Sequence, residues 1–71
     1  MSQAAELSQR EVLKIELRVL EEEHHDLDLA ISALAETGRD ILAVRRLKKK
    51  KLVLKDRITR IKDKLYPDII A

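Results

Sequence analysis

Two stretches of the chain carry mostly apolar residues in alternating steps of four and three positions. This is the heptad spacing of a helix that packs along one seam. The first stretch has the seam positions Leu13, Leu17, Leu20, His24, Leu27, Ile31 and Leu34. The second has the seam positions Val44, Leu47, Lys51, Leu54, Ile58, Ile61 and Leu65. The pattern predicts two long helices, over about residues 8–36 and 41–65.

The residues around these stretches favour a tight turn between two capped helices. Ser8, with Glu11 three positions later, has the spacing of a capping box at a helix start. Gly38 suits the left-handed conformation that ends a helix, and Asp40 is a good N-cap for the next one. We therefore expect a turn over residues 37–40.

The two seams match each other in one antiparallel register. Seam residues at equal distances from the turn lie opposite each other, from Leu34 with Val44 out to Leu13 with Leu65. The prediction is an all-α, antiparallel two-helix hairpin, coiled-coil-like, that forms a single domain over residues 1–71. The charges beside the seam predict the cross pairs Asp28 with Lys48, Glu21 with Lys55, Glu16 with Lys64 and Glu23 with Arg57.

Composition supports a rod-like helical protein that gains stability by association. Charged residues make up 39% of the 71 residues, with one Gly, one Pro and no Cys. This composition is typical of coiled coils. Such a short chain buries little apolar surface alone, and it has no disulfide to help. Self-association to a dimer, as a four-helix bundle, or binding of a helical partner is therefore expected.

Several large apolar residues fall outside the seams. If the hairpin stood alone, these side chains would contact water, which favours an interface. The predicted interface residues are Ile15, Val19, Leu29, Leu52 and Val53. The alternative is that these residues are tolerated as ordinary surface apolar side chains.

Charge is divided between the two halves. Residues 1–38 hold three Lys/Arg against nine Asp/Glu, and residues 39–71 hold twelve against four. Within the basic run 45–51, Lys48 and Lys50 flank the seam opposite the acidic helix. Arg45, Arg46 and Lys49 remain as candidates for binding nucleic acid or another polyanion, although the run contains no aromatic residue to stack on a base.

His24 and Lys51 are the polar residues of the seams, and Asp28 lies one helical turn after His24. We interpret the three as a polar layer that specifies helix register at some cost in stability. Two ligands at helical spacing are too few for a closed metal site, and no nucleophile, base and orienting group come together. We expect no catalytic residues, no metal, no cofactor and no enzymatic activity.

The ends of the chain carry their own expectations. The tail, residues 66–71, has Ile69 and Ile70 beyond Pro67; it either folds back near Leu13, binds another protein, or stays disordered. The N-terminus lacks the order of a signal peptide, and no apolar run approaches the roughly 20 residues that span a bilayer. We expect a cytoplasmic protein without a membrane partner.

Specific motifs resemble those of a known family. They are Glu23-His24 followed by Leu27-Asp28 in the first helix, Leu47-Lys48-Lys49 and Leu54-Lys55-Asp56 in the second, and a closing Pro67-Asp68-Ile69-Ile70-Ala71. Over about residues 13–71, the chain is similar to the YdcH-like family of small bacterial proteins of unknown function. The resemblance implies a helical hairpin and no established activity.

These observations leave two functional hypotheses. The first is a non-enzymatic protein-interaction module that uses the outer apolar residues, the C-terminal tail or both. The alternative is a basic helix that binds nucleic acid or another polyanion through residues 45–51.

Overall fold

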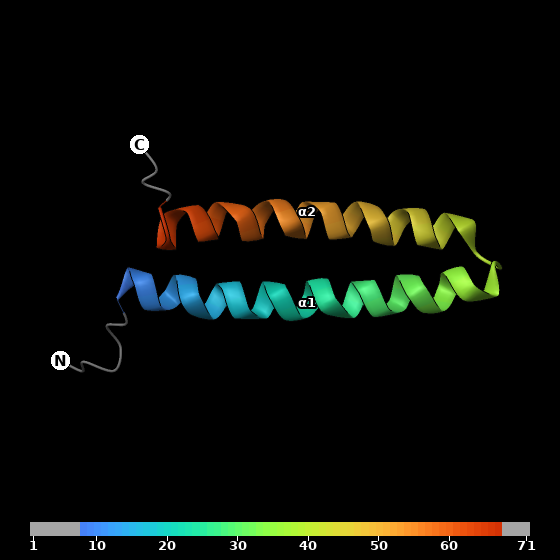
Figure 1. The fold of residues 1–71 in the computed structure, drawn as a ribbon, viewed down its shortest axis with the longest axis horizontal. Coiled ribbons are helices and arrows are strands. Elements are labelled where there is room, and N and C mark those ends of the chain that lie inside the picture. Colours follow the sequence, from blue (N-terminus) through green and yellow to red (C-terminus); the bar gives the residue numbers. More distant parts are fainter. Residues whose placement is uncertain (1–7, 68–71) are drawn as a thin grey trace.

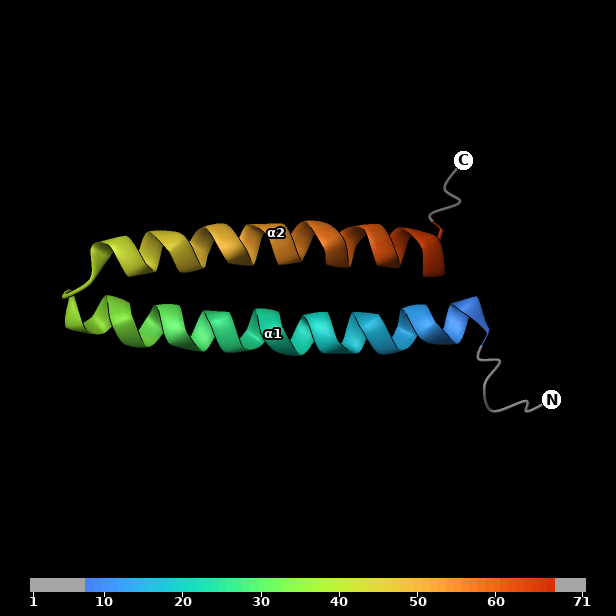
Figure 2. The ribbon, with the colours of Figure 1, turned by 180° about the vertical axis from the view of Figure 1, so that it is seen from behind.

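The chain folds into two antiparallel helices that lie side by side along their whole length. The computed structural model describes residues 8–67, with helix α1 at Gln9–Thr37 and helix α2 at Ile41–Leu65. Both views of the ribbon show the helices joined by a short turn at one end, so that the start of α1 and the end of α2 share the other, open end (Figures 1 and 2). The predicted all-α hairpin is confirmed. The predicted dimer stays a prediction, and the alternatives for Ile69 and Ile70 lie outside the described residues.

Local hydrogen bonds explain where α1 begins. The Ser8 hydroxyl accepts a hydrogen bond from the backbone N–H of Glu11 at 3.0 Å, and the Glu11 carboxylate accepts one from the backbone N–H of Ser8 at 3.3 Å. The two bonds form the predicted capping box. They satisfy donors that a helix start leaves unpaired.

The turn depends on one glycine and one aspartate. Gly38 has a φ of 63°, and its N–H donates to the Leu34 carbonyl at 3.2 Å. A residue with a Cβ adopts this left-handed conformation only with strain. Asp40 then accepts a hydrogen bond from the backbone N–H of Ala43 at 2.9 Å. Because one residue ends α1 and the other starts α2 two positions later, the chain reverses within a few residues.

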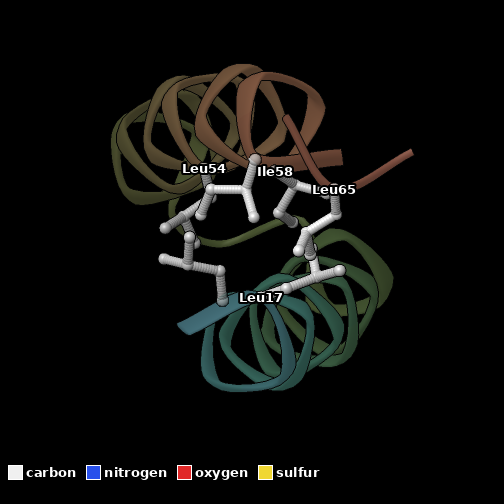
Figure 3. Packing of buried hydrophobic residues seen from close by; sticks show 6 residues of the cluster. Leu17, Leu54, Ile58 and Leu65 are labelled. Carbon is white, nitrogen blue, oxygen red and sulfur yellow. The ribbon is translucent and has the colours of Figure 1, made fainter. Parts of the chain in front are cut away.

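The core lies in the half of the seam that is nearer the open end. Its buried members are Leu17, Leu20, Leu54, Ile58, Ile61 and Leu65, and all are predicted seam residues. Figure 3 shows them pointing toward one another between the helices. Towards the turn, Ile31, Leu34, Val44 and Leu47 are only half-buried.

Flanking residues account for this difference between the two halves. At the open end the seam is bordered by Glu16, Glu21, Arg57 and Lys62, whose long stems cover apolar neighbours. Nearer the turn Lys48 and Lys50 also flank the seam, but the flanking positions 30, 35 and 43 are alanine and have almost no side chain. The same seam pattern is therefore less covered near the turn.

Arg10 links the two helices at the open end. Its Nη1 donates a hydrogen bond to the Leu65 carbonyl at 2.9 Å, and its guanidinium carbon lies 5.7 Å from the centre of the Tyr66 ring. A cation there satisfies a carbonyl that the end of a helix leaves unpaired and also interacts favourably with the aromatic ring. Sequence reasoning missed this contact, although Arg10 lies one turn before Leu13, the seam partner of Leu65.

Truncation of the core should reveal how unevenly the seam contributes to stability. Leu20 is 4% exposed and Leu52 is 66% exposed. We expect Leu20→Ala to lower the free energy of unfolding by about 2–3 kcal/mol, because it removes buried methyl groups and leaves a cavity. Leu52→Ala should change it by less than about 0.5 kcal/mol. Urea unfolding followed by circular dichroism measures both, and equal losses would contradict a core confined to the seam.

Candidate functional site

An apolar groove runs between α1 and α2 on one side of the hairpin. Leu27 and Ala30 of α1 and Val53 and Leu54 of α2 form its floor. Leu27 and Leu54 belong to the seam, and the groove reaches them because Ala30, at a flanking position, does not cover them. Val53 is 56% exposed there. Of the two seam residues, Leu27 is only half-buried, so the groove leaves this side chain partly accessible from one side.

The walls of the groove carry opposite charges. Glu23 and Asp26 line it on α1, and Arg46, Lys49 and Lys50 line it on α2. Each wall follows the charge bias of its own half of the chain. A partner surface that fills the groove would therefore contact anions along one edge and cations along the other.

The groove lies on one long face of the rod, which we call the groove face. Helical spacing of about 100° per residue places further residues beside those that line the groove. On α1 the groove face consists of Glu16, Val19, Glu23, Asp26, Ala30 and Ala33. On α2 it consists of Ala43, Arg46, Lys50, Val53, Arg57 and Arg60. Every charged residue of the first set is acidic, and every charged residue of the second set is basic.

The five predicted interface residues are all at least half exposed, but they do not form one surface. Ile15 and Leu29 lie at the back of α1, opposite its seam, while Leu52 and Val53 lie on different sides of α2. Val53 lines the groove, and Val19 belongs to the groove face. Sequence reasoning had assigned Leu27 and Leu54 to the closed seam and had overlooked Ala30. The signal that could have found the groove was the alanine at a position where coiled coils usually have a long side chain.

The structure brings together the three residues of the predicted polar layer. The Lys51 ammonium donates a hydrogen bond to Asp28 Oδ1 at 2.5 Å. The Nδ1 atom of His24 lies 3.7 Å from Asp28 Oδ2, which is too long for a hydrogen bond. Lys51 lies opposite Leu27, and it can reach the Asp28 carboxylate because a side chain on a helix leans toward the N-terminus of its own helix, which here is toward the turn. The cluster therefore centres on Asp28.

The hydrogen bond from Lys51 lowers the pKa of the Asp28 carboxyl below its ordinary value of 3.8. Partial desolvation acts in the opposite direction, and the nearby charges of Lys51, His24 and His25 add to the lowering. The carboxylate is therefore held in its charged form. The Nε2 atom of His24 is enclosed and has no hydrogen-bond partner within the described residues.

Most of the basic run stays free of ion pairs within residues 8–67. Lys51 is paired with Asp28, whereas Arg45, Arg46, Lys48, Lys49 and Lys50 are exposed and make no salt bridge there. The expected Asp28–Lys48 pair is not formed, because Lys51 engages Asp28 instead. The run is thus more available to an external anion than the sequence suggested.

The remaining cross pairs also differ from the expected ones. Glu16 pairs with Arg57 at 3.4 Å, and Glu21 pairs with Lys62 at 3.5 Å. Each carboxylate reaches a cation on the expected row of α2 but about two turns away from the predicted partner. For Glu21 and Lys62 the reason is that both side chains lean along their helices toward each other. The seam register alone does not specify which flanking residues meet.

The described residues contain neither a candidate metal site nor a candidate membrane span. No group of three His, Cys, Asp or Glu side chains within residues 8–67 could hold one metal ion. Neither α1 nor α2 is long and apolar enough to cross a lipid bilayer.

Comparison with known families places the chain. A family model described as protein of unknown function (DUF465) matches residues 17–66, which include most of both helices and the whole groove. The chain belongs to the DUF465 family. Searches of the curated proteins and of the solved structures give no match. The YdcH-like resemblance agrees with a small family of unknown function, and that name stays an interpretation of the motifs.

The Asp28 cluster of this DUF465 protein should make stability depend on pH in acid. Because the folded pKa of Asp28 lies below its unfolded value, its contribution is present above the unfolded pKa and is lost as pH falls through the folded pKa. We expect wild type to unfold at a higher temperature than Asp28→Asn at pH 7, and the two midpoints to converge as the pH falls below the ordinary carboxyl pKa of 3.8.

Thermal unfolding across this pH range provides the measurement. Asp63→Asn removes an exposed carboxylate that makes no salt bridge in the described part of the chain, and it serves as the matched control. A constant difference between wild type and Asp28→Asn at every pH would show that the Asp28 carboxylate contributes nothing through its charge.

Proposed function

We propose that this DUF465 protein is a non-enzymatic protein-interaction module that binds a helical surface along its groove face. The single observation that carries the proposal is the open groove, which leaves Val53 exposed and Leu27 only half-buried between walls of opposite charge.

The shape of the groove supports a helical partner. Two parallel rods leave a furrow between them, and a third helix of about 10 Å diameter can rest in it with its apolar stripe against the floor. Ala30 allows a close approach at the centre of the groove. The charged walls would then fix the orientation of the bound helix, because its edges meet anions on one side and cations on the other.

The energetics of the hairpin support a partner as well. A two-helix rod buries one narrow seam, and the half of that seam near the turn is only half-buried. A helix in the groove would remove Leu27 and Val53 further from water. Binding there would stabilise the hairpin and the complex together.

Two adjacent residues allow a sharply controlled test. Val53 lines the groove, whereas Leu52 is at least as exposed and projects to the other side of α2. We expect Val53→Glu to weaken binding of a native partner by at least about tenfold, because it replaces an apolar contact of the floor with a carboxylate that must lose its hydration when the groove is filled. Leu52→Glu should bind as wild type does.

Quantitative pull-down compares the three proteins. Each tagged chain is added to a native lysate that has been treated with nuclease, and the recovered partner proteins are measured. Circular dichroism first verifies that all three unfold at similar temperatures. Equal recovery of every protein partner by wild type, Val53→Glu and Leu52→Glu would contradict a role for the groove.

A second candidate function is polyanion binding at the turn end, and one observation favours it. Residues 29–50 hold Arg39, Arg45, Arg46, Lys48, Lys49 and Lys50 against Glu36 and Asp40. Over residues 8–28 and 51–67, by contrast, nine basic residues face nine acidic ones. The positive charge of the rod is therefore concentrated near the turn, where phosphates would be attracted.

Removal of three cations at either end separates this function from general basicity. We expect the triple variant Arg45→Gln, Arg46→Gln and Lys49→Gln to lose binding to duplex DNA or polyphosphate, with a smaller dependence on salt. The control variant, Lys55→Gln, Arg60→Gln and Lys64→Gln, loses the same charge at the open end and should retain binding. Fluorescence titrations at about 50 mM salt measure both, and no binding by wild type would exclude this function.

A further inference from the structure

We propose that the groove face binds a second copy of this chain, in a dimer whose two-fold axis runs parallel to the helices. This inference rests on the proposed function, since it names the partner that occupies the groove. The two turns lie at the same end of the dimer, and each α1 packs against α2 of the other copy. The result is an antiparallel four-helix bundle.

Charge complementarity selects this partner. On the groove face the charged residues of α1 are Glu16, Glu23 and Asp26, and those of α2 are Arg46, Lys50, Arg57 and Arg60. The face is thus divided lengthwise into an acidic and a basic half. A surface that complements it must carry the opposite order of charges, and rotation of the same face by half a turn about the long axis produces that order.

Charge also excludes the other face-to-face symmetry. If the two-fold axis lay across the rod, α1 would contact α1 and α2 would contact α2. The cations Arg46, Lys50, Arg57 and Arg60 would then lie against their own kind, and the three carboxylates would do the same. Like charges that face each other at an interface are strongly unfavourable. The parallel axis places each acidic edge on a basic edge.

The height of residues along the rod indicates which charges meet. Leu27 lies opposite Lys51 across the seam, so Asp26 and Lys50 are at nearly the same height. With the axis parallel to the rod, Asp26 of one copy faces Lys50 of the second copy. By the same reasoning, Glu23 faces Arg57 of the second copy, whose guanidinium also pairs with Glu16 of its own chain at 3.4 Å. Each contact occurs twice in the dimer.

The size of the face is sufficient for a stable dimer. About 25 helical residues at about 1.5 Å each give a length of about 40 Å, and two helices side by side are about 20 Å wide. Full contact would bury about 800 Å² on each copy, which is the ordinary size of a specific interface. Ala30, Ala33 and Ala43 lie on this face and permit close approach of the helices.

Charge reversal on each helix tests the arrangement. An α1 variant carries Glu23→Lys and Asp26→Lys, and an α2 variant carries Lys50→Glu and Arg57→Glu. Either variant alone should dimerise at least about tenfold more weakly than wild type, because the contacts between positions 26 and 50 and between positions 23 and 57 then join like charges. A 1:1 mixture should form heterodimers, and the chain with all four changes should again form homodimers. Sedimentation equilibrium and native mass spectrometry measure these states.

Single cysteines provide a second measurement that does not depend on charge. The chain has no cysteine of its own. Ala33→Cys in one chain and Arg46→Cys in another should form a disulfide-linked dimer when mixed, since the two positions lie on the groove face at nearly the same height. Neither single-cysteine chain should crosslink to itself with comparable yield.

The outcomes separate the dimer from the general interaction role. Monomeric wild type at several hundred micromolar, or self-crosslinking of Ala33→Cys in preference to the mixed pair, would overturn the proposed dimer. The comparison of Val53→Glu with Leu52→Glu against foreign partners would still decide whether the groove binds another protein. If wild type dimerises but neither charge reversal weakens it, the groove face is not the dimer interface.

Discussion

The whole structure depends on packing of the seam leucines and isoleucines at the open end of the hairpin. Leu17, Leu20, Ile58, Ile61 and Leu65 exclude water between α1 and α2, and they hold two helices that would be marginal as isolated peptides. The turn only has to connect what the seam holds together. Arg10 adds a polar contact at the point where the helices would otherwise separate, through the Leu65 carbonyl and the Tyr66 ring.

Towards the turn, the same seam serves a different purpose. Several of its flanking positions there are alanine, its apolar side chains are only half-buried, and a groove opens above Leu27. The two halves of the seam therefore have different roles, one in stability and one in binding. The half that is well covered by long charged side chains holds the hairpin, and the half that is poorly covered offers a surface.

The charges on this surface distinguish its two long edges. The halves of the chain have opposite charge, and the hairpin converts this difference in sequence into two parallel edges, one acidic and one basic. Within the described part of the chain, few of these charges neutralise each other across the seam, as Arg45, Arg46, Lys48, Lys49 and Lys50 show. These exposed charges can therefore act between molecules, where they affect orientation and association rate more than affinity.

The sequence by itself determined the helices, their capping residues, the turn and the seam register, because these follow from local hydrogen bonding and from a heptad period that one antiparallel alignment satisfies. It also identified His24, Asp28 and Lys51 as neighbours. Only the tertiary structure decided that Glu16 meets Arg57, that Glu21 meets Lys62, that Arg10 reaches Leu65, and that Ala30 opens a groove. These features depend on the direction and length of flexible side chains, and on the seam residues that a small flanking residue leaves uncovered. Heptad spacing determines which row a residue occupies, whereas the packed helices determine which atoms within that row meet.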